Sequence, residues 1–317
     1  MIFSLTVLGS SSALPTENRF PTAHVLNVHE RFFLIDCGEG TQIQLKRFGN
    51  IKYSKLNNIF ISHLHGDHIF GLFGLISSLD LMGRTADLNI YAHIDLKEIL
   101  DNHLKYFGEN MSYKIVFHPV NTFANEVVHE DHCMTVETIP LKHRVPACGY
   151  LFREKTPPRN IYKELIDKYK LSIADITRIK NGENFTTASG EEIPNEELTY
   201  LPYRPRSYAF CSDTMYSGKV ADIVKGVDLL YHEATFLDDM QSMARQTGHS
   251  TTTEAGEIAL KADVKRLLIG HFSSRYDNSM LVQFQKEVQQ VFPNSDIVVE
   301  GETYEIPLEK KCLRNTP

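Results

Sequence analysis

Four potential metal ligands lie within six residues of the chain, in the motif HLHGDH: His63, His65, Asp67 and His68. Imidazole and carboxylate groups suit zinc, and four of them so close together can serve two adjacent ions. The motif follows the apolar run Ile59–Ile61, which predicts a strand. In a turn after that strand, the first two histidines can face one ion while the aspartate and the last histidine face the other. Gly66 is expected to give the backbone the freedom for this reversal.

So short a motif cannot complete two coordination shells, so the remaining ligands must come from elsewhere in the chain. Several predicted strands end in a histidine or an aspartate: His143, Asp213, His232 and His271. Enzymes place polar groups at strand ends because rigid backbone fixes them there. A carboxylate such as Asp213 can bridge two cations, whereas His232 is either a ligand or a group that orients one.

Hydroxyl and guanidinium groups lie beside His249 and His271 in the sequence. They are Ser250, Thr251, Ser273, Ser274 and Arg275. Such groups can donate hydrogen bonds to a phosphate. Alternatively, the segment Ser250–Thr253 precedes Glu254 and a predicted helix, which is a plausible N-terminal capping arrangement. Both interpretations can hold together, because a helix N-terminus also attracts phosphate.

The elements that must position these groups alternate between strand and helix patterns. Strands are predicted at Ile2–Leu8, His24–Val28, Arg31–Ile35, Asn58–Ser62, Leu88–Ala92, Tyr113–His118, Met134–Leu141, Gly149–Arg153, Ser207–Ser212, Asp228–His232 and Arg266–Gly270. Helices are predicted at Thr41–Arg47, Ile69–Leu81, Asp95–Phe107, Thr252–Lys261 and Ser279–Val291. This alternation indicates the α/β class.

Residues 154–205 differ from the rest of the chain, since they are rich in Pro, Lys, Glu and Asn, with one candidate helix at Ile161–Tyr169. From Arg153 to Lys180, eight basic residues face four acidic ones, a local charge of +4. The basic residues after Arg153 are Lys155, Arg159, Lys163, Lys168, Lys170, Arg178 and Lys180. The segment is either a solvated linker or an insertion that handles an anionic ligand.

The whole chain has 317 residues, of which 42% are apolar and 23% charged, and a formal net charge of −7. This composition excludes a disordered or fibrous chain. No run approaches the roughly 18 apolar residues of a membrane helix, so we expect a soluble protein without a membrane partner. Its five cysteines are scattered without a C-x-x-C pair, which favours free thiols in a reducing cytoplasm. Net acidity argues at first against a nucleic-acid partner.

Several motifs resemble those of the ribonuclease Z family, the branch of the metallo-β-lactamase superfamily that processes tRNA 3′ ends, in its short form. They are TVLGSSSALP (6–15), DCGEGTQ (36–42), FISHLHGDHIFGLFGL (60–75), CSDT (211–214), HEATF (232–236), HSTT (249–252) and HFSSRY (271–276). HLHGDH alone is shared by many hydrolases of the superfamily, whereas HEAT followed by HST is far more specific to ribonuclease Z.

The resemblance implies two zinc ions per chain. One would be held by His63, His65, His143 and Asp213. The other would be held by Asp67, His68, Asp213 and His271. The resemblance also implies that Glu233 and His249 form an acid/base pair and that Asp67 accepts a proton. The implied fold is a four-layer αββα sandwich, with residues 1–308 as one metallo-β-lactamase-like catalytic domain.

In the family, an inserted arm binds the tRNA body, and residues 154–205 correspond to it. The seven basic residues given above from Lys155 to Lys180 would form this exosite. Family members often carry a Gly-Pro-rich motif in the arm, whereas this chain reads KLSIADI at residues 170–176. Residues 309–317 are expected to be a disordered tail, and the resemblance implies a cytoplasmic homodimer.

The leading hypothesis is a zinc-dependent endoribonuclease that removes the 3′ trailer from precursor tRNA. It would cut after the discriminator nucleotide and leave a 3′-hydroxyl on the tRNA and a 5′-phosphate on the trailer. The alternative is a binuclear-zinc phosphodiesterase or other small-molecule hydrolase on the same fold, with the arm as a dimer contact. A third reading, an RNA-binding or regulatory protein with a vestigial site, is disfavoured because every candidate ligand is present.

Overall fold

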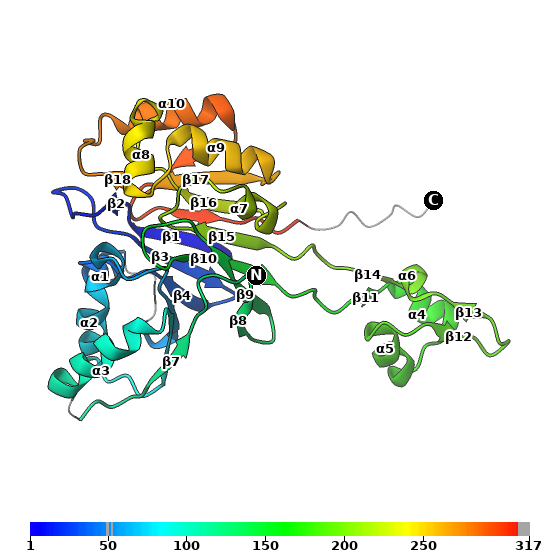
Figure 1. Ribbon diagram of the computed structural model, residues 1–317. Coiled ribbons are helices and arrows are strands. Elements are labelled where there is room, and N and C mark those ends of the chain that lie inside the picture. Colours follow the sequence, from blue (N-terminus) through cyan, green and yellow to red (C-terminus); the bar gives the residue numbers. More distant parts are fainter. Residues whose placement is uncertain (49–50, 52, 109, 310–317) are drawn as a thin grey trace. The chain divides into compact units, whose positions relative to one another are not determined.

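The computed structural model describes residues 1–48, 51, 53–108 and 110–309 (Figure 1). They form two compact units. The first comprises Met1–Glu130, Thr135–Arg153 and Ser207–Ile306, and the second comprises Asp131–Met134, Glu154–Arg206 and the described residues from Pro307 on. The tail expected at residues 309–317 lies, apart from Glu309, outside the described residues.

The first unit contains two seven-stranded mixed sheets. One has the order β20-β1-β3-β4-β5-β6-β7. Its strands are β1 (Phe3–Gly9), β3 (Ala23–Val28), β4 (Arg31–Ile35), β5 (Leu56–Phe60), β6 (Leu88–Ala92), β7 (Ile115–Pro119) and β20 (Thr303–Glu305). Strands β4 to β7 run parallel, and β1 pairs antiparallel with both β3 and β20.

The second sheet has the order β19-β17-β16-β15-β10-β9-β8. Its strands are β8 (Val127–Glu130), β9 (Met134–Pro140), β10 (Cys148–Glu154), β15 (Ser207–Cys211), β16 (Leu229–Glu233), β17 (Arg266–Gly270) and β19 (Ser295–Ile297). Strands β15, β16, β17 and β19 are parallel, and β10 pairs antiparallel with β15. A separate short pair joins β2 (Ser11–Ser12) to β18 (Phe272–Ser273).

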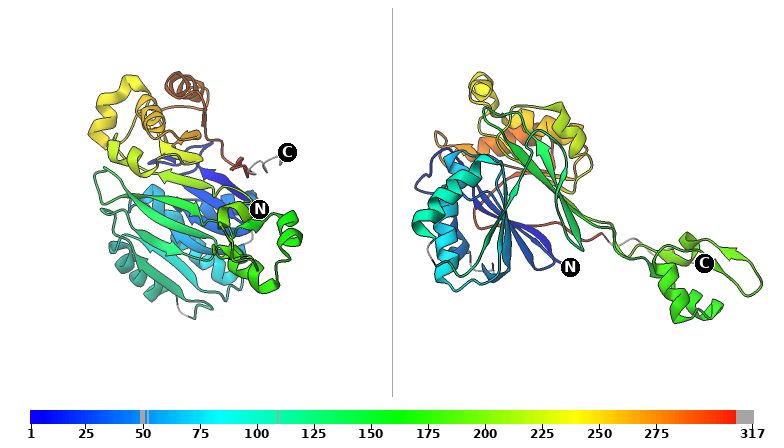
Figure 2. Two further views of the ribbon diagram at one scale, coloured as in Figure 1. Left: turned by 90° about the vertical axis from the view of Figure 1, so that its right-hand side faces the viewer. Right: turned by 60° about the horizontal axis from the view of Figure 1, so that its bottom comes forward.

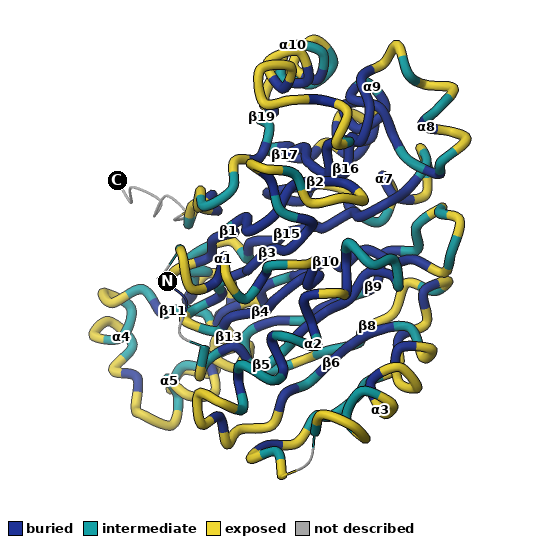
Figure 3. Tube along the Cα trace, turned by 90° about the vertical axis from the view of Figure 1, so that its left-hand side faces the viewer, coloured by how far each residue is buried: buried dark blue, intermediate teal, exposed yellow. Residues whose placement is uncertain are grey.

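An aromatic layer joins the inner faces of the two sheets. The ring centroids of Phe33 and Phe152 lie 5.9 Å apart, and those of Phe60 and Tyr150 lie 5.1 Å apart. The Tyr150 hydroxyl also donates a hydrogen bond of 2.7 Å to the carbonyl of Ile61. Since the central strands, such as β4 and β16, are buried on both faces (Figure 3), the outer faces of the sheets must be covered as well.

Helices provide that cover. On the first sheet they are α1 (Thr41–Arg47), α2 (Gly66–Leu81) and α3 (Asp95–Phe107), and on the second they are α7 (Gly218–Ile223), α8 (Gln241–Thr247), α9 (Thr252–Lys261) and α10 (Leu281–Val291). Leu72 and Leu75 of α2, for example, pack in one cluster with Ile59 and Ile90 of the sheet. The layers run helix, sheet, sheet, helix (Figures 1 and 2), which confirms the predicted αββα sandwich.

The second unit is small but has its own apolar cluster, formed by Ile161, Leu171, Ile179, Ile193 and Leu198. Its elements are β11 (Asn160–Ile161), α4 (Lys163–Tyr169), α5 (Ile173–Lys180), β12 (Phe185–Thr186), β13 (Glu192–Ile193), α6 (Asn195–Leu198) and β14 (Thr199–Tyr200). The KLSIADI segment begins α5, where Ser172 and Asp175 form a capping box. The segment is therefore folded and contains three helices rather than the one predicted.

The remaining described elements are two 3₁₀ turns, Tyr53–Lys55 and Asp238–Met240. Among the helices of the described ranges, none combines the length and apolar character needed to cross a bilayer.

Candidate metal centre and active site

The predicted ligands lie where strands of the two sheets end. His63 follows β5, Asp213 follows β15 and His271 follows β17. The carboxyl ends of the parallel strands β15, β16 and β17 meet at one edge of their sheet, which is where α/β folds commonly build sites. Segments far apart in the sequence thereby supply one cluster of side chains.

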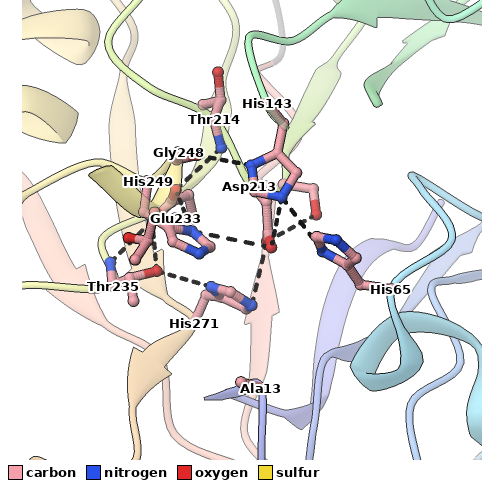
Figure 4. A network of polar contacts seen from close by, with 12 residues as sticks. Ala13, His65, His143, Asp213, Thr214, Glu233, Thr235, Gly248, His249 and His271 are labelled. Atoms are coloured by element: carbon pink, nitrogen blue, oxygen red, sulfur yellow. Dashed lines mark hydrogen bonds and ion pairs between the residues drawn. The ribbon is translucent and has the colours of Figure 1, made fainter. Parts of the chain in front are cut away.

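The first ligand group consists of His63, His65, His143 and Asp213, whose ligand atoms all lie within 4.8 Å of one another. His65 Nδ1 lies 3.0 Å from His63 Nε2 and 3.3 Å from His143 Nε2. Asp213 Oδ2 lies 3.4 Å from His63 Nε2 and 3.8 Å from His143 Nε2. Figure 4 shows His65, His143 and Asp213 directed at one another.

The second ligand group consists of Asp67, His68 and His271. Asp67 Oδ2 lies 3.4 Å from His271 Nε2 and 3.5 Å from His68 Nε2. Asp213 Oδ1 lies 3.2 Å and 3.4 Å from the same two nitrogens. Asp213 thus presents one carboxylate oxygen to each group, which is the position of a bridging ligand.

The far ring nitrogens of four of these histidines are held by other protein groups. His63 Nδ1 lies 3.0 Å from Ser62 Oγ, His68 Nδ1 2.7 Å from Asp36 Oδ2, His143 Nδ1 2.8 Å from the Gly248 carbonyl, and His271 Nδ1 2.9 Å from Thr235 Oγ1. Such partners fix the ring so that the other nitrogen faces the centre, as is typical of metal sites. His68 Nε2 is buried there with no hydrogen-bond partner. A nitrogen and oxygen donor set with an orphaned imidazole nitrogen fits zinc.

Asp36 is a site residue that sequence reasoning missed. Its Oδ2 accepts hydrogen bonds from His68 Nδ1 and from Ser62 Oγ at 2.8 Å, and its Oδ1 accepts one from the Ser62 amide at 2.7 Å. The residue is fully buried and has a left-handed φ of 57°. It directly follows β4, so the strand-end rule that found Asp213 would also have found Asp36.

Asp67 has a partner that the sequence did not predict, the backbone of Ala13. The Ala13 amide donates a hydrogen bond of 2.8 Å to Asp67 Oδ2, and Ala13 has a left-handed φ of 60°. The half-buried Glu300 anchors the loop that carries Ala13, because its Oε1 accepts hydrogen bonds from the Ser10 amide at 3.0 Å and the Phe20 amide at 2.9 Å. A backbone donor has no signature in residue type, so only the structure reveals it.

The HLHGDH motif is not the turn that we expected. Helix α2 begins at Gly66 rather than at Ile69, so Asp67 and His68 lie in its first turn. Gly66 is not among the described residues with a positive φ. Instead, a Cβ at this position would lie 2.3 Å from a ring carbon of Phe70. The ring of Phe70 occupies the space beside this glycine, and no left-handed backbone is involved.

Glu233 and His249 form a hydrogen-bonded pair beside the ligand groups (Figure 4). His249 Nδ1 lies 3.1 Å from Glu233 Oε1. Glu233 is fully buried and accepts further bonds from the amides of Thr214, Thr235 and Ser250 at 3.0, 2.9 and 3.0 Å. The carboxylate is therefore held rigidly with one oxygen toward the imidazole.

The electrostatics of the pair favour the charged forms. Burial alone would lower the pKa of His249, but the charge of Glu233 and the hydrogen bond to it outweigh burial and raise that pKa to about 9. Burial would likewise raise the pKa of Glu233, yet His249 lowers it below its ordinary value. His249 is thus protonated at neutral pH and suited to donate a proton.

The two carboxylates of the ligand groups are ionised. Burial would raise the pKa of Asp67, but His68 and the hydrogen bond from His271 bring it below its ordinary value. Burial is also outweighed at Asp213, whose pKa His271 and His68 hold well below the usual range. Both oxygen donors are therefore available to a cation.

The predicted phosphate-binding residues are not brought together. Ser250 is buried and its hydroxyl donates to the Thr214 carbonyl at 2.6 Å, while the Thr251 hydroxyl donates to Asp238 at 3.1 Å. Thr251 also caps α9, which supports the capping interpretation. Ser274 and Arg275 are exposed and line a separate cleft of about 200 Å³.

His232, which the sequence left ambiguous, lies outside every ligand group found among the described residues. It is buried, and its Nδ1 lies 2.7 Å from the carbonyl of Glu233. His232 therefore contacts the backbone of Glu233, the next residue in the chain, and not a ligand group.

The ligand groups open onto a cleft of about 510 Å³. Its lining includes His65, Asp67, Asp213 and His249, together with Leu14, Pro15, Phe70 and Arg144. The cleft is thus partly acidic, partly apolar and partly basic, and it gives outside molecules access to both groups.

The basic residues of the second unit differ in exposure. Five are exposed: Lys163, Lys168, Lys170, Arg178 and Lys180. Lys155 and Arg159 are half-buried, and Arg159 donates to the hydroxyl of Thr199 at 2.5 Å and to its carbonyl at 3.3 Å. Arg178 forms an ion pair of 2.7 Å with Asp175.

Curated proteins named ribonuclease Z match nearly the whole chain. That of Phocaeicola vulgatus is 47% identical over 308 residues, which cover 97% of this chain and 98% of its own. That of Bacteroides thetaiotaomicron is 48% identical over 300 residues and covers 94% of each chain. The chain belongs to the ribonuclease Z family.

Membership of the ribonuclease Z family makes the chain an endoribonuclease, and so a hydrolase. Human tRNase Z, short form, superposes with a TM-score of 0.70 at 23% identity and covers 96% of this chain and 99% of its own. YhfI of Bacillus subtilis, a metallo-β-lactamase fold protein, gives a TM-score of 0.67 at 20% identity, with 96% and 100% covered. These likenesses show that the fold is the metallo-β-lactamase fold. A family profile described as Anti-Pycsar protein Apyc1 matches residues 3–156.

Proposed function

We propose that this member of the ribonuclease Z family removes the 3′ trailer from precursor tRNA. It would cut directly after the discriminator nucleotide and leave a 3′-hydroxyl on the tRNA and a 5′-phosphate on the trailer. The observation that carries the proposal is the hydrogen-bonded pair of the buried Glu233 and His249, set beside two groups of ligands that share Asp213. The relatives named ribonuclease Z support the choice of substrate.

The proposal includes two zinc ions per chain, one in each ligand group. His63, His65 and His143 would hold the first, Asp67, His68 and His271 the second, and Asp213 both. Bound zinc would supply positive charge against the phosphate oxygens and would acidify the attacking water. The donor set and the orphaned His68 Nε2 support this assignment.

The chain's own groups would move the protons. Asp67, ionised and oriented by the Ala13 amide, would accept the proton of the attacking water. The 3′-oxygen leaves poorly as an alkoxide, so it needs a proton donor. His249 would supply that proton, and Glu233 would keep its imidazole charged and oriented.

The substrate would be bound at two places. The arm, residues 154–205, would contact the tRNA body through its exposed basic residues. Residues 1–308, within which the arm is inserted, would form the catalytic domain. Ser274 and Arg275, which line the separate cleft, would donate to another phosphate of the substrate. We include in the proposal that the protein is a homodimer and acts in the cytoplasm, as part of tRNA maturation.

The decisive experiment combines metal analysis with cleavage of a 3′-extended precursor tRNA. We expect about two zinc ions per chain and a cut mapped directly after the discriminator nucleotide, with the termini given above. A protein that hydrolyses bis(p-nitrophenyl) phosphate but leaves the precursor uncut with zinc supplied would contradict the tRNA assignment.

His249→Ala tests the proton donor. The cleavage rate should fall by about 10²- to 10⁴-fold, the usual contribution of a general acid, while bound zinc stays unchanged. His103→Ala, on α3 and outside the lining of the cleft, is the matched control. Loss of zinc from His249→Ala would make this histidine a ligand instead, because it also lies within a possible ligand group with Asp213 and His271.

A further inference from the structure

The cleft beside the ligand groups carries an apolar surface that the proposed chemistry does not use. Leu14, Pro15 and Phe70 contribute to the lining together with Asp67 and His249. Leu14 is 60% exposed and Phe70 is 63% exposed. Large apolar groups that stay exposed together at a concave surface mark the place of a ligand.

The ring of Phe70 lies against the helix that carries the ligands. It stands one turn after Gly66 in α2, so the two residues share a face of the helix. A Cβ at Gly66 would meet three carbons of the Phe70 ring at 2.3, 2.5 and 2.9 Å. The ring therefore lies against the first turn of α2, directly beside the residue that precedes Asp67.

We infer that Phe70 is a stacking surface for one unpaired nucleobase next to the scissile phosphate. The inference rests on the proposed RNA cleavage. An aromatic ring binds the face of any base, without hydrogen bonds and without selecting a sequence. Single-stranded bases are free to leave their neighbours and stack in this way, whereas paired bases are not.

The position of Phe70 gives this contact a role in the reaction. A base held against the ring would place the adjoining phosphate in the same cleft as Asp67, Asp213 and His249. Arg144, exposed in the lining of that cleft, has no ion pair among the described residues and can face the negative backbone. The substrate class is thus RNA that is single-stranded at the cut.

A double-mutant cycle tests the inference with three substrates. They are a 3′-extended precursor tRNA and two derivatives with an abasic ribonucleotide, one on each side of the cut. Phe70→Ala should lower kcat/KM on the intact precursor about tenfold or more, as expected for the loss of one base–aromatic stack. With the unsubstituted protein, kcat/KM on one of the abasic substrates should be lower than on the intact precursor by a similar factor. Phe70→Ala should not lower kcat/KM on that abasic substrate any further.

Two variants control for structure. Phe70→Trp keeps a ring face and should retain cleavage of the intact precursor. Phe107→Ala removes an aromatic residue that is 72% exposed on α3 and outside the cleft lining, so it should change nothing. Zinc content should be the same in all variants, because Phe70 belongs to neither ligand group.

Unchanged cleavage by Phe70→Ala, or an equal loss on the intact and both abasic substrates, would overturn the inference and leave the proposed function standing. If the unsubstituted protein cuts no precursor, the proposed function fails instead. Stacking is then measured by binding RNA with 2-aminopurine at the same two positions, since stacking quenches its fluorescence. Quenching that Phe70→Ala abolishes supports the inference, and quenching that it leaves intact overturns it.

Discussion

Asp36 shows how single residues behind the ligands determine the geometry of the site. Asp36 is not among the residues that line the cleft, yet its carboxylate sets the ring of His68 through Nδ1 and fixes Ser62 at two atoms. Ser62 in turn holds the ring of His63. One buried carboxylate therefore orients a histidine of each ligand group.

Asp36→Asn is expected to weaken metal binding by about 10- to 100-fold, the usual effect of losing such a partner. The amide keeps the size of the side chain but removes the charge that supports His68. Zinc affinity measured by competition with a chelator checks this. Asp222→Asn, an exposed residue of α7, is the matched control, and an affinity equal to that of the control would contradict the role given to Asp36.

The pH above which cleavage activity falls, its alkaline limit, is expected to depend on Glu233. His249 donates its proton only while protonated, and its pKa of about 9 means that activity should fall as the pH rises through that value. Glu233→Gln removes the charge that raises this pKa, so the limit should move to lower pH. The pH profile of kcat/KM measures the shift, with Glu257→Gln on the exposed side of α9 as the control. An unmoved alkaline limit would mean that His249 is not the acid.

Among single residues, the sequence predicts those whose side-chain type itself indicates metal binding. His63, Asp213 and His271 were accessible because a histidine or aspartate ends an apolar strand. The sequence could not predict the role of Ala13, because this residue acts through its backbone amide. It could not predict the role of Glu300 either, because Glu300 bonds to the amides of residues 290 and 280 positions away in the chain.

Among the helices and strands, α9 connects a capping box at its N-terminus to the active site. Its N-cap is Thr251, whose side chain accepts from the Glu254 amide, and the Glu254 carboxylate accepts from the Thr251 amide at 3.1 Å. His249 stands two residues before this cap. The capping box thus fixes the point where the chain, having passed His249 beside Glu233, enters the helix.

Thr251→Ala should destabilise the protein by about 1 kcal/mol, the usual value of an N-cap. Urea unfolding measures the change, and Thr253→Ala, two positions further into the same helix, serves as the control. Zinc content should not change. A variant with unaltered stability but weaker precursor binding would instead favour the phosphate-binding interpretation of Thr251.

Periodicity predicted the longer elements and missed those that depend on context. The strand at Arg31–Ile35 and the helices at Asp95–Phe107 and Thr252–Lys261 have the predicted bounds. The edge strands β19 and β20 are only three residues each, too short for a periodic signal. Helix α5 was hidden in a charged segment, although Ser172 and Asp175 already had the spacing of a capping box.

The insertion of the arm is the main feature at the scale of the whole molecule. Arg153 of β10 and Ser207 of β15 are paired in register. Just beyond them, the Glu154 amide donates to the Arg206 carbonyl at 2.9 Å, and their side chains form a buried ion pair of 2.7 Å. The chain therefore enters and leaves the arm through two neighbouring antiparallel strands.

This geometry allows a clean deletion. Replacing residues 155–205 by Asn-Gly, a favoured two-residue hairpin turn, should preserve the sheet and the hydrolysis of bis(p-nitrophenyl) phosphate. Cleavage of precursor tRNA should fall by about 100-fold or more, as expected when several phosphate contacts are lost together. An equal loss of both activities would show that the arm is structural.

The salt dependence of precursor binding should come mainly from the arm. Neutralising Lys163, Lys168 and Lys180 to Gln should reduce the slope of log affinity against log salt by about one for each phosphate contact removed. The same change at Lys105, Lys225 and Lys286, exposed in the first unit, should leave the slope nearly unaltered. Equal slopes in the two triple variants would contradict the arm as an exosite.

The way the arm leaves and rejoins the sheet also bears on ancestry. Since its two ends are already hydrogen-bonded neighbours and its apolar cluster is its own, the segment can be acquired, shortened or exchanged between lineages without disturbing the strands that end in the ligands. Chemistry and substrate choice can then be inherited separately. Descendants of one catalytic scaffold can diversify in what they recognise while the reaction itself stays under continuous selection.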